Sequence, residues 1–448
     1  MIGIAIANSF GLNKLSGINP DAAAFIAATG ITSTTEINAV NALVNGLQAD
    51  GLWSKMKAVY PFVTDNRNVL GYSEDFGNAY WGKLNSTITS NSVTAPNGTT
   101  TADTFTGSSA TSYIYTNTPI SSIGNNTFSI YVKAGTLTSF RLDFATTALS
   151  YGGTSIINLT TGTAGPITFY GGASGWTVNV ESVGNGWYRC SIGGNIATTQ
   201  NMFCEILSAA GTLYLWGAQL EISASATTYQ PIATTQQAYI ASQFKYNLKD
   251  PRDLDAAFRL VFNGGWTHSS TGATPNGTNG YADTKLVPST NGFTTANGHI
   301  SFYSRDTSVN GQYPVDLGVD QTGTGLNVSQ KMSSIDSVSF HGRAYAQLLT
   351  GVDSNNITGL HIVTRISTTS LKYNRNGSVI QTNSVLEAGT IPNVALFLGC
   401  TNNNGTAGLY STRQAAFASI GNGLTDTEAA NLYTRVQAFQ TALNRQIS

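Results

Sequence analysis

The feature that most constrains the fold is a series of short segments in which apolar and polar residues alternate. Between about Asn66 and Gln237 they are separated by Gly, Asn and Ser, and they read FSIYVK, FRLDFA, WTVNVES, WYRCSI, MFCEIL and YLWGAQLEI. Successive side chains of a strand point to opposite faces of its sheet, so this alternation predicts half-buried strands. Many such strands punctuated by turn residues are typical of an antiparallel β-sandwich.

A second series of alternating segments follows, and it begins with a change in composition. The stretch KYNLKDPRDLDAAFRLVF (residues 245–262) concentrates charge that the preceding segments lack. The later segments read HISFYSR, LHIVTRI, SLKYN, SVIQT, VALFLG and AAFASIG. Asn376-Gly377 between two of these segments predicts a tight hairpin. We therefore predict a second sandwich.

Helical patterns are confined to the two ends of the chain. Asn19-Pro20 places a capping residue before proline at the first helical position. Ser33-Thr34-Thr35-Glu36 fits a capping box, and LWSKMKAVY is interpreted as a further short helix that stops at Pro61. Thr425 to Glu428 fit another capping box ahead of a final helix. Its apolar stripe consists of Ala429, Leu432, Tyr433, Val436, Phe439 and Leu443.

These patterns predict a mainly β chain in three parts. Residues 1–65 form the N-terminal helical anchor part of a host domain, residues 66–237 form an inserted β-sandwich, and residues 238–448 form the host β-sandwich with the C-terminal helix. Insertions are tolerated at exposed loops when the ends of the inserted domain lie close together. The alternative, three domains in a row, leaves the amphipathic N-terminal helices without a partner.

Low charge excludes some classes of partner. Charged residues make up 10% of the 448 residues and the net charge is −1, so we expect no nucleic-acid partner. No apolar run approaches the roughly 18–20 residues of a membrane-spanning helix, so we expect no membrane insertion. The opening MIGIAIANSFG lacks a positively charged region and is a poor signal peptide. We expect assembly in a cytoplasm and exposure later.

Several long sequence segments resemble those of known protein families. GLWSKMKAVYPFV, YNLKDPRDLDAAFRLVFNGGWTHSSTGATPNGTNGYADTKL, TSLKYNRNGS and AFASIGNGLTDTEAANLYTRVQAFQTALNRQ resemble structural proteins of tailed-bacteriophage virions, of the fibre, spike or minor virion type. NVLGYSEDFGNAYWGK, TAPNGTTTADTFT, FSIYVKAG, GWYRCSI and YLWGAQLEISASATTYQP are similar to jelly-roll carbohydrate-binding modules. The host β-region also resembles concanavalin- or laminin-G-like sandwiches.

The resemblance implies a non-enzymatic virion protein, assembled in the bacterial host cytoplasm, that displays a jelly roll. Its implied partners are other virion proteins of the capsid, neck or tail, further copies of itself in a trimer, and cell-surface glycans. Two alternatives remain open: a tailspike-like depolymerase that cleaves host surface polysaccharide, and a purely decorative capsid protein. No long heptad repeat enforces a trimer.

Four residues are candidates for binding glycans. In WYRCSI, Trp187 shares a strand face with Arg189 and Ser191, and an aromatic ring beside a cation can stack on a sugar. Trp176 and Tyr170 flank the glycine-rich GGASG. Each of these aromatics can equally be a packing residue. In YLWGAQLE, alternation places Trp216 on the uniformly apolar face with Tyr214 and Ala218, so Trp216 is expected in the core.

Catalytic and metal-binding motifs are not recognisable in the sequence. The four histidines are scattered, and no HExxH, CxxC, GxSxG after a strand, or P-loop occurs. Glu74-Asp75 lacks the oxygen-rich loop that calcium requires, so we expect no metal and no cofactor. Any two carboxylates can serve a glycosidase, which keeps the depolymerase open. Cys190 and Cys204 are expected on neighbouring strands, as buried thiols rather than a disulfide.

Overall fold

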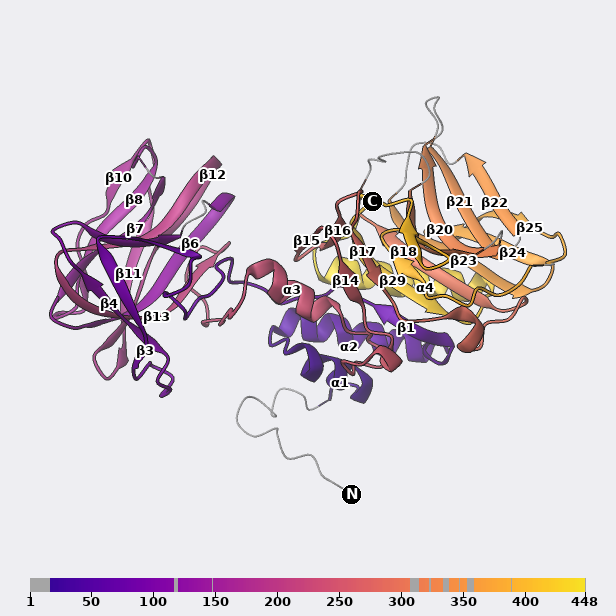
Figure 1. Cartoon of the computed structure of the whole chain (residues 1–448), viewed down its shortest axis with the longest axis horizontal. Coiled ribbons are helices and arrows are strands. Elements are labelled where there is room, and N and C mark those ends of the chain that lie inside the picture. The colour runs from indigo at the N-terminus through magenta and orange to yellow at the C-terminus, as the bar shows by residue number, and fades with distance from the viewer. Residues whose placement is uncertain are drawn as a thin grey trace, which may run out of the picture. The chain divides into compact units, whose positions relative to one another are not determined.

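A computed structural model describes residues 17–116, 120–146, 148–306, 314–321, 324–332, 338–345, 347–352, 358–387 and 389–447. The chain is mainly β with antiparallel sheets and few helices, which confirms the predicted fold class. It divides into two compact units (Figure 1). We call Met1–Asp65 with Ile240–Ser448 the split unit, and Asn66–Tyr239 the inner unit.

The inner unit has two layers of strands that share one long strand, β12 (Trp187–Ser208). The first half of β12 pairs with β6 and β11, and its second half pairs with β7 and β5. The layer that we call the β13 layer consists of β3 (Ser86–Val93), β4 (Ala102–Gly107), β6 (Ile120–Ala134), β11 (Thr177–Gly184) and β13 (Gly211–Glu221). The β7 layer consists of β2 (Trp81–Leu84), β5 (Ser112–Thr116), β7 (Ser139–Thr146), β8 (Gly152–Asn158), β9 (Thr163–Ala164) and β10 (Thr168–Tyr170).

The core of the inner unit lies between these layers. Phe128 and Leu215 of the β13 layer and Leu142 of the β7 layer belong to one buried cluster. Cys190 and Cys204 also belong to it as free thiols. Both lie on β12, so the expectation of neighbouring strands is wrong: the segments WYRCSI and MFCEIL are one continuous strand that crosses from one layer to the other.

The split unit contains two sheets. In the first sheet, β1 (Met56–Tyr60) pairs with β29 beside the path β15-β16-β29-β18-β23-β24-β25. The strands of that path are β15 (Trp266–Ser269), β16 (Gly272–Pro275), β29 (Ala415–Gly421), β18 (Gly298–Ser304), β23 (Gly359–Ser367), β24 (Ser370–Arg375) and β25 (Ser378–Asn383). The second sheet consists of β14 (Val261–Asn263), β17 (Tyr281–Asp283), β26 (Phe397–Leu398), β19 (Val315–Gln321), β20 (Thr324–Met332), β21 (Val338–Tyr345), β22 (Gln347–Val352), β27 (Thr401–Asn403) and β28 (Thr406–Gly408).

Helices from both ends of the chain pack on the first sheet of the split unit (Figure 1). One buried cluster joins residues of α1 (Pro20–Thr29), α2 (Thr34–Ala49) and α4 (Asp426–Ala442) to Val59, Tyr303 and Phe417 of the sheet. Arg435 of α4 also pairs with Asp50 at 2.8 Å. The chain passes between the units within α3 (Gln236–Phe244). Short 3-10 helices are η2 (Trp53–Lys55), η3 (Asp255–Ala257) and η4 (Pro288–Thr290).

Most of the local signals at element ends are confirmed. The Asn19 side chain caps α1 by accepting from the Asp21 N–H at 3.0 Å. Thr425 and Glu428 form the predicted capping box of α4. Asn376 and Gly377 have φ values of 48° and 81°, as a tight turn between β24 and β25 requires.

Two local predictions are wrong, each because of a contact distant in sequence. Ser33 makes no side-chain capping bond; the chain entering α2 is held instead by Asp65, which accepts from the Thr32 N–H at 2.7 Å. The segment Met56–Tyr60 is a strand rather than a helix, because it pairs with β29 and buries Val59 and Tyr60 completely.

Candidate functional site

Trp187 lies in a small apolar cluster on the outer face of the β13 layer. Its side chain is 1% exposed, and its indole N–H donates to the Thr94 carbonyl at 3.1 Å. It packs with Trp216, Ala95 and Ala102, so the segment between β3 and β4 covers this face. The expectation that Trp187 lies outside the core is therefore corrected: a covering loop, which alternation cannot reveal, encloses it.

Trp216 is buried as expected, at 5% exposed, but on the other face of its strand from the one predicted. The register of β13 against β6 shifts between Trp216 and Gln219, where Gly217 has φ 62°. A bulge at this point reverses the alternation. Leu215 and Ala218 consequently both face the main core, and Trp216 faces the small cluster with Trp187.

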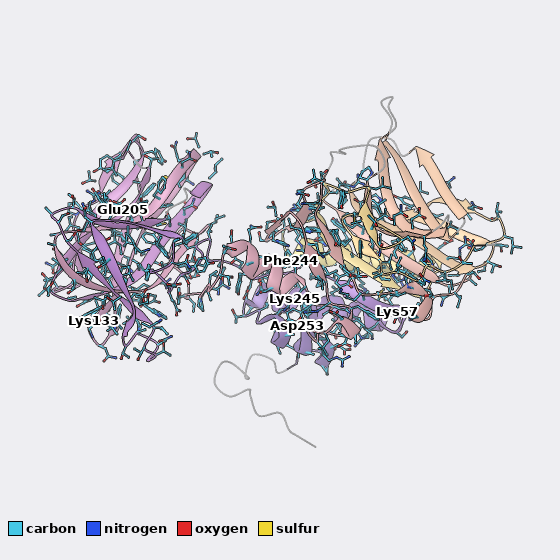
Figure 2. All side chains as sticks on the ribbon, viewed as in Figure 1. Lys57, Lys133, Glu205, Phe244, Lys245 and Asp253 are labelled. Atoms are coloured by element: carbon cyan, nitrogen blue, oxygen red, sulfur yellow. The ribbon has the colours of Figure 1, made fainter. Side chains whose placement is uncertain are left out.

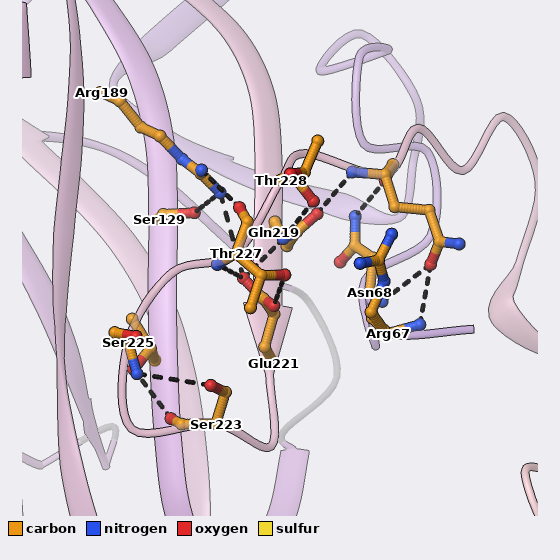
Figure 3. A network of polar contacts seen from close by, with 12 residues as sticks. Arg67, Asn68, Ser129, Arg189, Gln219, Glu221, Ser223, Ser225, Thr227 and Thr228 are labelled. Atoms are coloured by element: carbon orange, nitrogen blue, oxygen red, sulfur yellow. Dashed lines mark hydrogen bonds and ion pairs between the residues drawn. The ribbon is translucent and has the colours of Figure 1, made fainter. Parts of the chain in front are cut away.

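Arg189 belongs to a buried polar network next to that cluster (Figure 3). Its guanidinium donates to the Ser129 hydroxyl at 3.0 Å and to the Thr227 carbonyl, and it lies 3.9 Å from the Glu221 carboxylate. Its carbon Cζ also lies 5.4 Å from the centre of the Tyr131 ring. These partners hold the guanidinium of Arg189 inside the inner unit, where the residue is buried.

The same network ties the first and last segments of the inner unit together (Figure 3). The Gln230 N–H donates to the Gln219 side chain at 2.6 Å. The Asn68 amide donates to the carbonyls of Ala218 and Gln230, both at 3.0 Å. Residues near both ends of the unit are thus fixed to strand β13.

Trp176 is buried in the main core, so the expectation that its ring is available for stacking on a sugar is wrong. Its side chain is 6% exposed and packs against Phe144, with ring centres 5.8 Å apart. Two glycines make room for the indole: a Cβ at Gly194 would lie 2.2 Å from its Cδ1 atom, and a Cβ at Gly153 would lie 3.2 Å from its Cε3 atom. Tyr170, the fourth candidate, is half-buried at the end of β10 in the β7 layer.

The outer face of the β7 layer carries a row of polar and aromatic side chains that runs across the strands. Residues that pair directly across antiparallel strands point to the same face. We call the following the central row, in strand order: Gly82, Tyr115, Glu205, Asp143, Thr154 and Thr168. A parallel flanking row consists of Leu84, Tyr113, Leu207, Arg141 and Ile156. With strands about 4.8 Å apart, the central row is about 24 Å long.

Aromatic and apolar groups of these rows are accessible to solvent. The Tyr115 ring lies directly over Gly82, because a Cβ added there would be 2.4 Å from its Cζ atom. Tyr113 and Tyr115 are half-buried, and Leu84 and Ile156 are 50% and 54% exposed. A tyrosine ring supported from below by a glycine offers its other surface as a flat platform.

A cluster of one arginine and two acids lies beside that platform. Arg141 holds Asp143 through two nitrogens, Nε at 2.8 Å and Nη2 at 2.5 Å, and its Nη2 is 3.6 Å from the Glu205 carboxyl. Glu205 also hydrogen-bonds to Asp143. Glu205 is labelled among the side chains of the inner unit in Figure 2. Burial, together with the negative charge of Asp143, raises the pKa of Glu205 to about 8. Burial likewise raises the pKa of Asp143, although Arg141 opposes this rise.

An open hollow lies at one end of the same strands. Its lining consists of hydroxyl and amide side chains and of Ala148, and the lining residues are Thr146, Ala148, Ser150, Thr199, Gln200 and Asn201. Thr146 and Ser150 hydrogen-bond to each other through their hydroxyls at 2.8 Å. The hollow therefore offers hydroxyl and amide groups for hydrogen bonding at that end of the strands.

Sequence reasoning selected Tyr170 from this layer but missed the rows. The signal was present in part: alternation in FRLDFA places Arg141 and Asp143 on one face, and TSYIYT does the same for Tyr113 and Tyr115. What was hidden is the register that aligns Tyr115, Glu205 and Asp143 across three strands.

Groups of three metal-binding side chains are absent from the described part of the chain. Glu74 is half-buried and Asp75 is exposed at the surface of the inner unit. Among the helices of the described ranges, none is both long and apolar enough to cross a membrane.

Comparison with known proteins gives only distant likenesses. No protein-family model and no curated protein matches the sequence. A NanB sialidase structure from Streptococcus pneumoniae matches at 13% identity and a TM-score of 0.27, over 37% of this chain and 27% of its own. Domain 4 of the arabinanase AbnA from Geobacillus stearothermophilus, in complex with arabinotriose, matches at 12% identity and a TM-score of 0.27, over 39% of this chain and 80% of its own.

A third solved structure is similar to the same degree. The CBM40 domain of the Ruminococcus gnavus IT-sialidase, bound to α2,3 sialyllactose, matches at 15% identity and a TM-score of 0.22, over 30% of this chain and 79% of its own. At TM-scores this low, these likenesses assign neither a family nor a function to the chain.

Proposed function

We propose that the inner unit is a non-catalytic glycan-binding module and that its site is the outer face of the β7 layer. The observation that carries this proposal is the central row, where Tyr115, Glu205 and Asp143 lie opposite one another on three neighbouring strands. Sugars are bound by aromatic faces that stack on their rings and by polar groups that hydrogen-bond their hydroxyls. The row supplies both kinds of group on rigid strands.

The contrast between the two outer faces supports this choice of site. On the β13 layer, Trp187 and Trp216 are covered by the segment between β3 and β4. On the β7 layer, Leu84 and Ile156 are exposed, and Arg141 and Glu205 keep 25% and 23% of their side chains exposed. Within the inner unit, a ligand can reach the second face without any rearrangement of the strands.

For the whole chain we propose a structural role in a tailed-bacteriophage virion, as a fibre- or spike-type subunit in a homo-oligomer. The resemblance of the long segments quoted above to that family supports this role. In such an arrangement the split unit anchors the protein to other virion proteins, and many displayed copies of the inner unit raise the avidity of weak single sites. Mass analysis of purified particles tests the role, and absence of the protein from the particles would refute it. Light scattering tests the trimer.

One observation favours a second function, a polysaccharide depolymerase: Glu205 is a carboxyl with a raised pKa beside a second carboxyl. Glycosidases place their two carboxyls about 5–5.5 Å or about 6.5–9.5 Å apart. Glu205 and Asp143 instead share a hydrogen bond, and Arg141 holds Asp143 in place. The Asp143 side chain is also only 3% exposed, so a substrate can reach at most one of the two carboxyls, and binding without cleavage is the better explanation.

A glycan array tests the proposed function with the full chain. Retention of the protein on a subset of glycans, with no release of reducing ends from the corresponding polysaccharides, is the expected result. Release of reducing ends that the substitution Glu205→Gln abolishes would favour the depolymerase. If the folded protein binds no glycan, even when multimerised, the glycan-binding proposal is refuted and the decorative role is the remaining explanation.

A further inference from the structure

An acidic ligand requires an unpaired positive charge, and the two rows of the proposed site offer none. Of the residues in the central and flanking rows, Arg141 is the only basic one. Two nitrogens of the Arg141 guanidinium donate hydrogen bonds to the Asp143 carboxylate, whose side chain is 3% exposed. Glu205 adds a second carboxyl at 3.6 Å from the same guanidinium. The cluster therefore has more acids than cations, and its guanidinium is already paired.

A ligand carboxylate gains little from this cluster. Bringing it to Arg141 places it next to Asp143 and Glu205, and like charges at such distances repel. Glu205 adds to this repulsion when it is ionised, and while its carboxyl is protonated the charge of Asp143 alone repels the ligand. Lys83 of β2 directs its ammonium to the carbonyls of Gly77, Asn78 and Trp81, at 3.2, 3.0 and 2.9 Å.

Uncharged sugar hydroxyls fit the same groups. The Glu205 carboxyl oxygens accept hydrogen bonds from hydroxyls, the exposed Thr168 side chain offers a hydroxyl of its own, and Tyr115 supplies the platform. Hydroxyl groups bring no charge that the low-dielectric face would have to compensate.

We propose that this face selects uncharged saccharides and rejects glycans that carry carboxylates, such as sialylated or uronic-acid chains. The inference rests on the proposed glycan-binding function and specifies its substrate class. In this proposal Tyr115 contributes to the affinity for the sugar, and Glu205 and Asp143 repel acidic sugars.

Matched polysaccharides test the selection. The full chain is run in native gels that contain dextran, galactan or hydroxyethyl cellulose, and in gels that contain the carboxymethylated form of each. We expect binding to at least one neutral polymer that is about tenfold stronger than binding to its carboxymethylated form. At about pH 9, where Glu205 is ionised, Glu205→Lys is expected to bring that ratio close to one, and Glu205→Gln to reduce it partly. Glu181→Lys, the same change at an exposed position of β11, is the control and should leave the ratio unchanged.

The outcomes separate the two proposals. Equal or stronger binding of the carboxymethylated polymers, lost in Tyr115→Ala, would overturn the selection and leave the glycan site in place. An unchanged ratio in both folded Glu205 variants would also overturn the role of Glu205. Binding to none of the six polymers by the folded protein would count against the glycan site itself.

Discussion

Glu205 on β12 lies directly opposite Asp143 on β7, and their two carboxyl groups lie within hydrogen-bonding reach of each other. Asp143 also receives two hydrogen bonds from Arg141. A buried carboxylate is tolerated when its charge is paired and its oxygens are hydrogen-bonded. Asp143 is thus the fixed centre of the cluster, and Glu205 is its more exposed, titrating member.

The titration of Glu205 predicts a pH dependence of stability. Its pKa rises from 4.5 to about 8 on folding. The stability that this shift contributes is therefore fully present below about pH 4.5 and is lost as the pH rises to about 8. Calorimetric unfolding of the full chain between pH 5 and pH 8.5 should show the inner unit weakening with rising pH, and Glu205→Gln should flatten this slope. An equal slope in wild type and variant would contradict the assignment, and Glu181→Gln provides the control.

Trp187 is predicted to matter for stability and not for binding. Removal of a fully buried tryptophan side chain costs about 3–5 kcal/mol, and Trp187 is 1% exposed beneath the segment between β3 and β4. Denaturant unfolding of Trp187→Ala should show a loss in this range, whereas Tyr170→Ala at the end of β10 should lose less than about 1 kcal/mol. Wild-type stability together with lost glycan binding in Trp187→Ala would restore the sequence-based interpretation.

Alternation predicted the strands well because each strand of a sandwich buries one face. Alternation gave the wrong environment where a single residue shifts the strand register or a loop covers the outer face of the sheet. Gly217 inserts a bulge that reverses the faces of β13, so Trp216 was placed with Ala218 although the two lie on opposite sides. Burial of Trp187 depends on the segment after β3, and the pairing of Tyr115 with Glu205 depends on a register. Neither is encoded within a single segment.

Similar limits applied at the helices. Thr425 and Glu428 form their capping box because both partners are local. Ser33 was expected to cap α2, but Asp65, far along the chain, holds that turn. Local hydrogen bonds were therefore predictable, and those that depend on tertiary contacts were not.

The polar network at the ends of the inner unit predicts that this unit folds when excised. The Val69 N–H donates to the Leu220 carbonyl at 2.8 Å and the Ser73 N–H to the Ile232 carbonyl at 2.9 Å, so both ends belong to its own structure. Residues 66–239 should give a dispersed amide spectrum and a cooperative melt. Residues 66–225, which lack Thr227 and Gln230, should not; a cooperative melt of the shorter fragment would show that the network is dispensable.

Glu221 provides a point test of the same network. It accepts from the Thr227 N–H at 2.9 Å and lies near Arg189. Removal of one partner of a buried charged group leaves the other uncompensated and costs about 3–5 kcal/mol. We expect Glu221→Ala to fall near the lower end of that range by denaturant unfolding. The double variant Glu221→Ala with Arg189→Met should recover part of the loss, and additive losses would contradict the pairing.

Gly82 is predicted to support binding through Tyr115. Its substitution by alanine places a methyl group where the Tyr115 ring now lies, 2.4 Å from Cζ, so the ring must move. We expect Gly82→Ala to weaken glycan binding several-fold, since a stacking contact is worth about 0.5–1.5 kcal/mol. The melting temperature should change little because the ring can turn towards solvent. Unchanged affinity would mean that the platform does not contact the ligand.

The most direct test of the glycan-binding face is titration calorimetry of the full chain with a glycan that the array identifies. Wild type is compared with Tyr115→Ala and with Tyr410→Ala, a half-buried tyrosine of the split unit. We predict that Tyr115→Ala loses about tenfold or more in affinity with an unchanged melting temperature, and that Tyr410→Ala binds like wild type. Wild-type affinity in Tyr115→Ala would contradict the assignment of the site to the β7 layer.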